Sequence, residues 1–365
     1  MDGPGRTILD CAESMDPGKV RVVIGTFDGG AAANGAYASD ACRRGLPVEI
    51  IHESGPLDPS IPRQIIHLID KHQVDILHTH DARTDLFGVV VARRRPVVLV
   101  STVHGWISNS VKARFINWLD KRLLRRMDCV IAVSEDTREK LGHSFPKART
   151  IVIPNALRTE NYLSGNDASQ FRAENGFRES DVLIANIGRL SPEKGQALFL
   201  NAGEQILKRC RDARLVLIGI GQDESKLREL ASRLGILAKV RFLGFVQDMR
   251  QVYPALDLVV QSSYTEGMPN VILESLLLNT PVIATAVGGT QEIIVNQQHG
   301  VLIPSGDVSA LVAAMGEFLE NRDRHRIMAC EGGARIRKDF DHNRRVQMLK
   351  NLYSSLTGRA HESPA

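Results

Sequence analysis

Short apolar runs alternate with longer helical patterns along almost the whole chain, and this alternation limits the fold more than any other feature of the sequence. Such runs, rich in valine and isoleucine, are typical of strands in a parallel sheet that helices cover on both faces. The sequence therefore predicts an α/β protein. We expect its strands at residues 20–25, 48–51, 75–79, 97–102, 130–133 and 150–153, and in a second series at residues 182–187, 214–218, 240–242, 257–260, 281–285 and 300–304.

The two series of strands predict two domains. A chain of 365 residues exceeds one ordinary core, and residues 157–176, between the series, show no clear period. We predict two Rossmann-like, doubly wound domains that face a central cleft, at residues 1–160 and 161–340. A C-terminal helix and tail, residues 341–365, is expected to pack back toward the first domain. Ligands in such folds bind at the carboxyl ends of the strands.

Composition excludes several other classes of protein. Hydrophobic residues make up 43% and charged residues 24%, as in a globular protein. No apolar run approaches the ~20 residues that span a bilayer, and the N-terminus lacks the pattern of a signal peptide, so we expect a cytoplasmic protein. The five cysteines form no CxxC pair, which argues against disulfides or structural zinc. A net charge of +4 is too small to indicate nucleic acid.

One candidate site follows the strand expected at residues 182–187. The loop contains Gly188, Arg189, Lys194 and Gly195. Glycine allows backbone conformations that other residues avoid, and a guanidinium, an ammonium and the free amides of a helix start together suit a diphosphate. The alternative is a solvated loop with two ordinary surface cations.

A second candidate is the segment from Glu266 to Glu274. Pro269 stands where a first helical residue is expected, which leaves the amides of Met268, Asn270 and Val271 available to an anion or a sugar hydroxyl. Glu274 falls within an apolar helix, so its carboxylate needs a partner. The hydroxyls of a nucleotide ribose would serve, and a buried ion pair with an arginine is the alternative.

Histidines mark the ends of two strands in the first half. His78 and His80 alternate on one strand, so their side chains point the same way. No third ligand is in register with them, and we expect no metal. His104 follows the next strand, and its alternative role is that of a partly buried structural histidine.

In this order, the segments GRLSPEKG (188–195), VRFLGFV (240–246), EGMPNVILES (266–275) and PVIATAVGG (281–289) resemble the retaining GT-B-fold glycosyltransferases of family 4, also called glycosyl transferases group 1. The resemblance implies hexosyl transfer from a nucleotide-diphosphate sugar, bound by the second domain, to a hydroxyl acceptor bound by the first. The acceptor would be a glycan or lipid-linked intermediate in cell-surface polysaccharide synthesis. No metal or other cofactor is expected.

The resemblance also implies roles for individual residues. Arg189 and Lys194 would hold the donor diphosphate and stabilise it as it leaves, Glu274 would bind the ribose, and Glu266 would face the transferred sugar. His104 would reach the sugar and is the fourth implied catalytic residue beside Arg189, Lys194 and Glu266. The whole donor site would comprise Gly188, Arg189, Lys194, Gly244, Phe245, Val246, Glu266, Gly267, Met268, Pro269, Asn270, Val271 and Glu274. Gly3, Gly5 and His80 would lie on the phosphate-loop or acceptor side.

The start of the chain departs from the pattern of the family. Its members begin with a strand, a glycine-rich loop and a helix, whereas residues 1–9 read as the loop and helix alone. The sequence predicts that one strand of the first sheet is missing. Asp339-Phe340-Asp341 has the D-x-D pattern of metal-dependent transferases, but we interpret Asp341 as a helix N-cap.

Residues 111–126 combine six cations with six large apolar residues in a helical pattern. A basic amphipathic helix of this kind binds anionic membrane surfaces, and the alternative is a solvated helix that packs on its own sheet. Two other classes of function also remain open. One is a nucleotide-sugar epimerase or a phosphorylase-like enzyme on the same fold, and the other is a catalytically silent binding protein.

Overall fold

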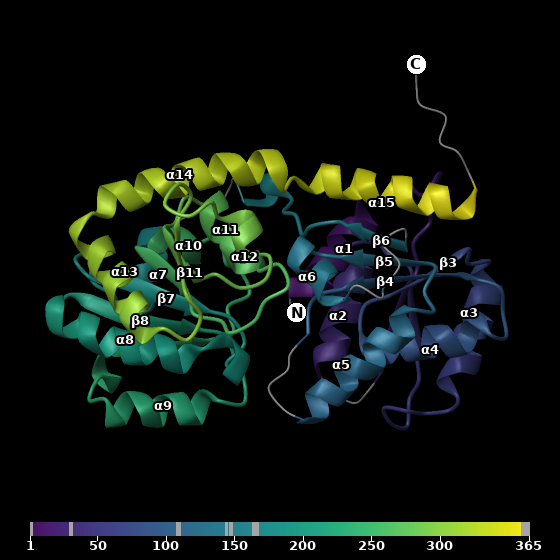
Figure 1. The fold of residues 1–365 in the computed structure, drawn as a ribbon, viewed down its shortest axis with the longest axis horizontal. Helices are drawn as coiled ribbons and strands as arrows, with labels where there is room; N and C mark the ends of the chain where they lie inside the picture. The colour runs from purple at the N-terminus through teal and green to yellow at the C-terminus, as the bar shows by residue number, and fades with distance from the viewer. Residues whose placement is uncertain are drawn as a thin grey trace, which may run out of the picture. The chain divides into compact units, whose positions relative to one another are not determined.

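The computed structural model describes residues 3–28, 32–106, 111–142, 145, 149–162 and 168–358. The chain forms two compact units, one of residues Met1–Ala156 with His342–Ala365 and one of residues Leu157–Asp341 (Figure 1). We call them the N-terminal unit and the C-terminal unit. The boundary lies between Ala156 and Leu157, and the last helix belongs to the N-terminal unit.

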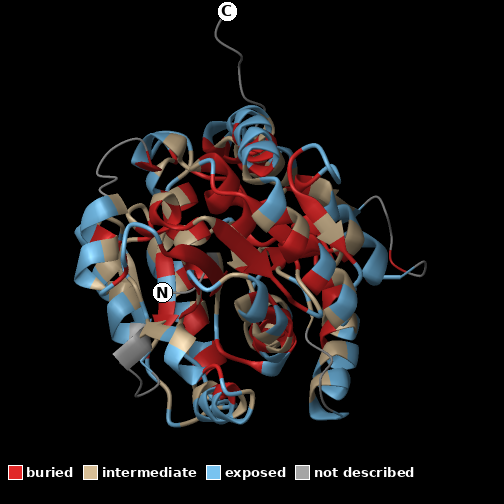
Figure 2. Cartoon of the chain, turned by 90° about the vertical axis from the view of Figure 1, so that its left-hand side faces the viewer, coloured by how far each residue is buried: buried red, intermediate tan, exposed pale blue. Residues whose placement is uncertain are grey.

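The C-terminal unit is built on a six-stranded parallel sheet in the order β12-β11-β10-β7-β8-β9. Its first strand, β7, is central, as in a doubly wound fold. Figure 2 shows buried strands surrounded by helices with exposed outer faces. The strands are β7 (Val182–Ile187), β8 (Ala213–Ile218), β9 (Val240–Gly244), β10 (Leu258–Gln261), β11 (Val282–Thr285) and β12 (Val301–Ile303). The helices are α7 (Ala168–Glu174), α8 (Gln196–Arg209), α9 (Glu224–Arg233), α10 (Val252–Ala255), α11 (Asn270–Leu277), α12 (Thr290–Ile293), α13 (Val308–Glu320) and α14 (Arg322–Asp339).

The N-terminal unit has two separate parallel sheets. One pairs β1 (Ile24–Phe27) with β2 (Val48–Ile51), and the other has the order β3-β4-β5-β6. The second sheet comprises β3 (Ile76–Thr79), β4 (Val98–Val103), β5 (Cys129–Ala132) and β6 (Thr150–Val152). The helices are α1 (Gly3–Glu13), α2 (Ala32–Arg43), α3 (Ile61–His72), α4 (Ala82–Ala92), α5 (Val111–Leu124), α6 (Glu135–Lys140) and α15 (His342–Thr357). The structure confirms the α/β class and the two Rossmann-like units.

Most strands lie within two residues of their predicted bounds, but the first does not. The prediction of a strand at residues 20–25 is wrong for residues 20–23, because β1 begins at Ile24. A strand needs a neighbour for its backbone groups, and within the described chain residues 20–23 pair with no strand. Val20 and Val22 nevertheless pack against the apolar cluster that contains Val100 of β4 and Ile131 of β5.

The segment at residues 157–176, predicted as a linker, contains a helix that belongs to the C-terminal unit. Arg172 on α7 donates hydrogen bonds to the Asp257 carboxylate at 2.8 Å and to the backbone oxygen of Asp181 at 2.9 Å. These bonds fix α7 against the amino ends of β7 and β10. Arg172 therefore ties this helix to the sheet rather than leaving it in a free linker.

Helix α5 turns its large apolar side chains toward solvent. Val111, Phe115 and Trp118 are 74%, 62% and 50% exposed, and only Asp120 and Leu124 of this helix are buried. Asp120 accepts a hydrogen bond from the Trp106 indole at 2.7 Å, which ties the helix to the end of β4. Leu123 and Leu124, however, pack in an apolar cluster with residues of β4 and β5. The alternative that the apolar side of this helix packs on its own sheet therefore holds for its last turn and is wrong for the exposed apolar residues before it.

Two helical glycines provide a matched test of the packing. A Cβ on Gly203, in α8, would lie 2.3 Å from the buried side chain of Leu215, whereas one on Gly35, in α2, would meet nothing within 4 Å. We expect Gly203→Ala to lower the free energy of unfolding by about 1–3 kcal/mol through overpacking, and Gly35→Ala to raise it by up to ~1 kcal/mol. Denaturant unfolding of both variants tests this, and equal effects would contradict the packing described.

Candidate functional site

Four loops of the C-terminal unit meet at the carboxyl edge of its sheet, where β7, β8, β10 and β11 end. Glycines let their backbones touch: a Cβ on Gly195 would lie 2.0 Å from the oxygen of Ser262, and one on Gly219 would lie 2.0 Å from that of Gly188. A Cβ on Gly288 would lie 2.1 Å from the oxygen of Glu266. No side chain fits at these contacts, so glycine is required for the loops to close on one another.

Lys194 and Glu266 form an ion pair across this edge. The Lys194 ammonium donates to both carboxylate oxygens of Glu266, at 2.7 and 2.9 Å, and the Ser263 hydroxyl donates to the same carboxylate at 2.6 Å. The loop after β7 and the loop after β10 are thus joined by charge as well as by backbone contact. An ammonium has three donors, so Lys194 can contact a phosphate while it holds Glu266.

Arg189 lies on the same loop and pairs with a different carboxylate, that of Glu193. Its guanidinium donates to buried Glu193 at 2.8 Å, although the arginine side chain is 61% exposed. Burial acts to raise the pKa of Glu193, but hydrogen bonds from Ser191, the backbone and Arg189 outweigh it and hold the pKa below its usual value. Glu193 therefore stays anionic and binds one nitrogen of the Arg189 guanidinium. The rest of the guanidinium is exposed and accessible to a ligand.

Glu274 is buried and is held by two tyrosines. Its carboxylate accepts hydrogen bonds from the hydroxyls of Tyr162, at 2.9 Å, and Tyr253, at 2.7 Å. Tyr162 comes from 112 residues earlier in the chain. Nothing in the sequence near Glu274 indicates either tyrosine. That Glu274 binds a ribose stays a prediction.

The helix after Glu266 begins one residue later than expected. Pro269 has extended backbone angles and is the N-cap of α11, so Asn270 is the first helical residue. The predicted first helical position for Pro269 is therefore wrong. Gly267, in the turn before it, accepts a hydrogen bond from the amide of Gly289 at 2.7 Å, which joins this turn to the loop after β11.

Other predicted donor-site residues lie at neighbouring strand ends. Gly244 ends β9 with a left-handed φ of 66°, and Phe245 directly after it is 55% exposed. The turn before α11 buries Met268. The predicted contacts of Gly188, Gly244, Phe245, Val246 and residues 267–271 with a nucleotide stay predictions.

Gly3 and Gly5 belong to a helix. Both lie in the first turn of α1, so the prediction that they form a glycine-rich loop is wrong. Pro4 between them explains the difference, because proline has the φ of a first helical turn and lacks the amide that such a turn leaves unpaired.

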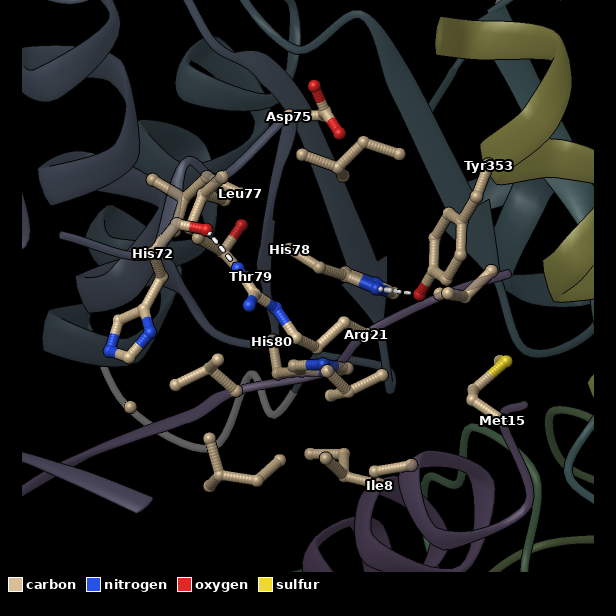
Figure 3. Close-up of a pocket in the computed structure, with 18 of the residues that line it drawn as sticks. Ile8, Met15, Arg21, His72, Asp75, Leu77, His78, Thr79, His80 and Tyr353 are labelled. Carbon is tan, nitrogen blue, oxygen red and sulfur yellow. Dashed lines mark hydrogen bonds between the residues drawn. The ribbon is translucent and has the colours of Figure 1, made fainter. Parts of the chain in front are cut away.

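Three histidines of the N-terminal unit gather at the carboxyl ends of β3 and β4. The rings of His78 and His80 stack at 4.4 Å, and Nδ1 of His80 lies 3.3 Å from Nε2 of His104. His78 is further bonded to the Tyr353 hydroxyl at 2.7 Å, as Figure 3 shows, and to Thr102 Oγ1 at 2.8 Å. Sequence reasoning missed Tyr353, which reaches this cluster from α15.

Two of these histidines, His78 and His80, are neutral near pH 7. Burial, followed by the nearby charges of Arg345 and His104, lowers the pKa of His78 to about 3. Burial likewise lowers the pKa of His80 well below its usual value. In the described part of the chain, no group of three or more His, Cys, Asp or Glu residues has the arrangement of a metal site. His78 and His80 therefore offer hydrogen bonds rather than positive charge.

Comparison with known proteins identifies the class of this chain. Residues 167–333 match the family "Glycosyl transferases group 1", and residues 1–161 match "Glycosyltransferase Family 4". EpsD of Bacillus subtilis (strain 168), which is named as a glycosyltransferase, is 30% identical over 318 residues, or 82% of each chain. An Escherichia coli UDP-Gal:α-D-GlcNAc-diphosphoundecaprenol α-1,3-galactosyltransferase is 26% identical, over 78% of this chain and 76% of its own.

Solved structures agree on the fold. Anabaena HepE in complex with UDP-glucose is 24% identical and superposes with a TM-score of 0.86 over 97% of this chain and 96% of its own. Sucrose-phosphate synthase from Thermosynechococcus elongatus is 20% identical, with a TM-score of 0.77 over 96% and 98%. The two units are thus those of a GT-B glycosyltransferase. The chain belongs to glycosyltransferase family 4 and is a transferase.

The buried histidines predict acid sensitivity of the N-terminal unit. An unfolded histidine binds a proton below pH ~6.5, whereas folded His78, with its pKa of about 3, does not. The unfolded state binds more protons in this window, so the free energy of unfolding falls as the pH drops from about 6.5 toward 3. We expect His78→Gln to show a shallower fall, and His67→Gln, on the exposed side of α3, to match the wild type.

Urea unfolding between pH 7 and pH 4.5 measures this dependence. An unchanged slope in His78→Gln would show that His78 is not the group responsible.

Proposed function

We propose that the protein transfers a hexosyl group from a nucleotide-diphosphate sugar to a hydroxyl of a glycan or lipid-linked acceptor in cell-surface polysaccharide synthesis, with retention of anomeric configuration. The observation that carries the proposal is the loop after β7, which presents two cations, each held by a carboxylate, at the carboxyl edge of the sheet. The lipid-linked acceptor is supported by the name of the Escherichia coli relative, whose acceptor is a diphosphoundecaprenol.

Arg189 and Lys194 would bind the diphosphate of the donor. The guanidinium of Arg189 is exposed and suits two phosphate oxygens at once, and Lys194 supplies a compact charge beside it. Two fixed cations stabilise a departing diphosphate as a divalent metal does elsewhere, so we propose that transfer needs no metal ion. Glu266, held by Lys194 and Ser263, would accept hydrogen bonds from hydroxyls of the transferred sugar.

In the proposed reaction, the bond from the anomeric carbon to the diphosphate breaks and the bond to the acceptor oxygen forms on the same face of the sugar. The acceptor proton passes to the departing diphosphate. Positioning and stabilisation of the leaving charge supply most of the acceleration. The imidazole of His104 would hydrogen-bond a hydroxyl of the donor sugar. A covalent intermediate on Glu266 is the alternative, and its ion pair with Lys194 disfavours it because the pair weakens the carboxylate as a nucleophile.

We further propose that α5 holds the protein on an anionic membrane surface, where a lipid-linked acceptor is found. Its exposed aromatic side chains would enter the interface, with Phe115 stacked on Trp118 at 5.8 Å and Arg122 over the Trp118 ring at 4.5 Å. Cations beside them would meet anionic headgroups at about 1 kcal/mol each. No helix in the described ranges is long and apolar enough to cross a bilayer.

Product analysis separates transfer from its rivals. With a donor sugar and a mixed-acceptor extract, a transferase joins the sugar to the acceptor and releases the nucleoside diphosphate. An epimerase returns an isomeric donor, a phosphorylase-like enzyme makes a sugar phosphate, and a silent binding protein leaves the donor intact.

A thermal-shift screen against UDP, GDP, ADP and their sugars, without metal, tests the donor site. A ligand at ~100 times its dissociation constant adds about 2.7 kcal/mol to the free energy of unfolding. We expect one base to give a clear shift, and Arg189→Ala and Lys194→Ala to weaken binding ~10–100-fold through loss of bonds to charged oxygens. Arg233→Ala is the matched control, because Arg233 is similarly exposed and also pairs with a glutamate four residues away.

No shift with any nucleotide, or an equal loss in Arg233→Ala, would contradict the proposed donor site.

Flotation with liposomes tests the membrane proposal. We expect binding to vesicles that contain anionic lipid, weaker binding at high salt because the charges are screened, and a loss of at least ~5-fold in Phe115→Ala with Trp118→Ala, since both rings leave water. Ile327→Ala is the control, because Ile327 is 61% exposed and belongs to α14 rather than to α5. Binding that is independent of salt or of Phe115 and Trp118 would refute the role of α5.

A further inference from the structure

Two aspartates of the N-terminal unit are buried together and take no part in the reaction proposed above. Asp85, on α4, is 2% exposed, and Asp120, on α5, is 6% exposed. The two helices lie side by side (Figure 1), and the two carboxyl groups hydrogen-bond each other. We call these two residues the acid pair. A buried carboxylate is costly without donors around it, so the hydrogen bonds of the pair decide how many protons it carries.

Asp85 is bound to the strands of the sheet. Its carboxyl group accepts a hydrogen bond from the hydroxyl of Thr79, the last residue of β3, and another from the hydroxyl of Ser101 on β4, at 3.1 Å. Thr79 directly precedes His80. Asp85 therefore joins α4 to the strand end that carries this histidine.

Asp120 has a donor for one of its two oxygens. Its Oδ2 accepts the indole N–H of Trp106 at 2.7 Å, and Trp106 follows His104 by two residues. Its Oδ1 is buried, and among the described residues no group with a fixed donor bonds to it. A carboxyl group donates only when it carries a proton, so a protonated Asp85 supplies the donor that Asp120 needs.

The acid pair holds one proton near pH 7. Burial is the main cause that raises the pKa of Asp85 to about 8, and the charge of Asp120 adds to it, while the hydrogen bond from Thr79 acts against it. Burial likewise raises the pKa of Asp120. Repulsion between two adjacent carboxylates disfavours the loss of the second proton further. The pair therefore carries one negative charge rather than two.

The elements packed around the acid pair offer little to offset a second charge. Asp81, at the N-cap of α4, raises the pKa of Asp120, and Lys121, next to it on α5, lowers it. The strands present hydroxyl groups, and His80 at the end of β3 is neutral. On its other side, α4 packs against α3 through an apolar cluster that contains Phe87. A second charge on the pair would be opposed by Asp81 and offset in part by Lys121.

We propose that the acid pair positions the strand ends that carry His80 and His104. One proton, donated by Asp85 to Asp120, closes a chain of hydrogen bonds that runs from the end of β3 through α4 and α5 to Trp106 after β4. When this proton leaves to solvent, two carboxylates face each other and the chain opens. The relevance to transfer rests on the proposed function, in which His104 bonds the donor sugar, whereas the sharing of the proton does not.

The test uses Trp106 as a reporter that needs no donor or acceptor. The chain has two tryptophans, so Trp118→Phe leaves Trp106 as the only one. Its fluorescence is followed from about pH 6.5 to about pH 9.5, below the range in which tyrosine and lysine titrate. We expect the emission to shift to longer wavelength with a midpoint near pH 8, where Asp85 loses its proton, because the indole then loses its fixed partner and meets water.

Three further variants identify the group that titrates. Asp85→Asn should abolish the shift, because its amide donates to Asp120 at every pH and still accepts from the strands. Asp120→Asn should abolish it too, since one carboxylate then remains. Asp128→Asn is the matched control and should keep the shift: Asp128 also accepts a hydrogen bond from β4, at the amide of Leu99, but it is exposed.

The imidazole NMR signals of His80 and His104 show whether the histidines move with the acid pair. We expect both to shift with the midpoint of the Trp106 emission, and to stay constant in Asp85→Asn; His80→Gln and His104→Gln assign them. Histidine signals that do not follow Trp106 would refute the positioning role.

No fluorescence transition in the parent protein, or one that persists in Asp85→Asn, would overturn the sharing of the proton. A persisting transition would assign the titration to another group, such as the exposed cysteines, which titrate in the same range. Because neither readout uses a nucleotide or a sugar, a failed donor screen leaves both results valid.

Discussion

The contact of loop backbones at the carboxyl edge of the C-terminal sheet is the constraint on which the donor site depends. Gly195 against Ser262, and Gly288 against Glu266, bring the loops after β7, β10 and β11 within van der Waals distance. Only then can Lys194 on one loop reach Glu266 on another at 2.7 Å. The charges are therefore placed by backbone geometry, and a side chain at either glycine would separate the cation from the carboxylate without changing either residue.

The sequence predicts structure well where the cause is local. β7 is an apolar run, interrupted by Asn186, between two strands, and its predicted bounds match the structure. The prediction fails where the cause lies elsewhere in the chain: residues 20–23 have a strand pattern but no neighbouring strand among the described residues. Likewise, the apolar helix around Glu274 shows that its carboxylate needs a partner. One of its partners, Tyr162, is 112 residues away, so the sequence near Glu274 does not indicate it. The pattern of α5 shows that it is amphipathic, but only the packing around Asp120 and Leu124 shows which side is covered.

The two units use similar strand ends for different chemistry. At the edge of the C-terminal sheet, Arg189 and Lys194 bring positive charge, and each has a carboxylate beside it. At the edge of the N-terminal sheet, burial keeps His78 and His80 neutral. The proposed transfer of a sugar from a charged leaving group to an uncharged hydroxyl fits this division. The resemblance to family 4 pointed to both edges, but only the structure shows that His78 and His80 at the second one are neutral.

The ion pairs of Arg189 and Lys194 have a consequence for ionic strength. Each cation already has a counter-ion that is fixed to the protein, so an arriving diphosphate would join the carboxylate beside each cation and release few dissolved anions. Its affinity should then change little with added salt, whereas attraction between α5 and a charged surface is screened within a Debye length of about 8 Å at physiological ionic strength. If α5 binds a lipid surface and the loop after β7 binds the donor, as proposed, salt would detach the enzyme from the surface while leaving the nucleotide in place.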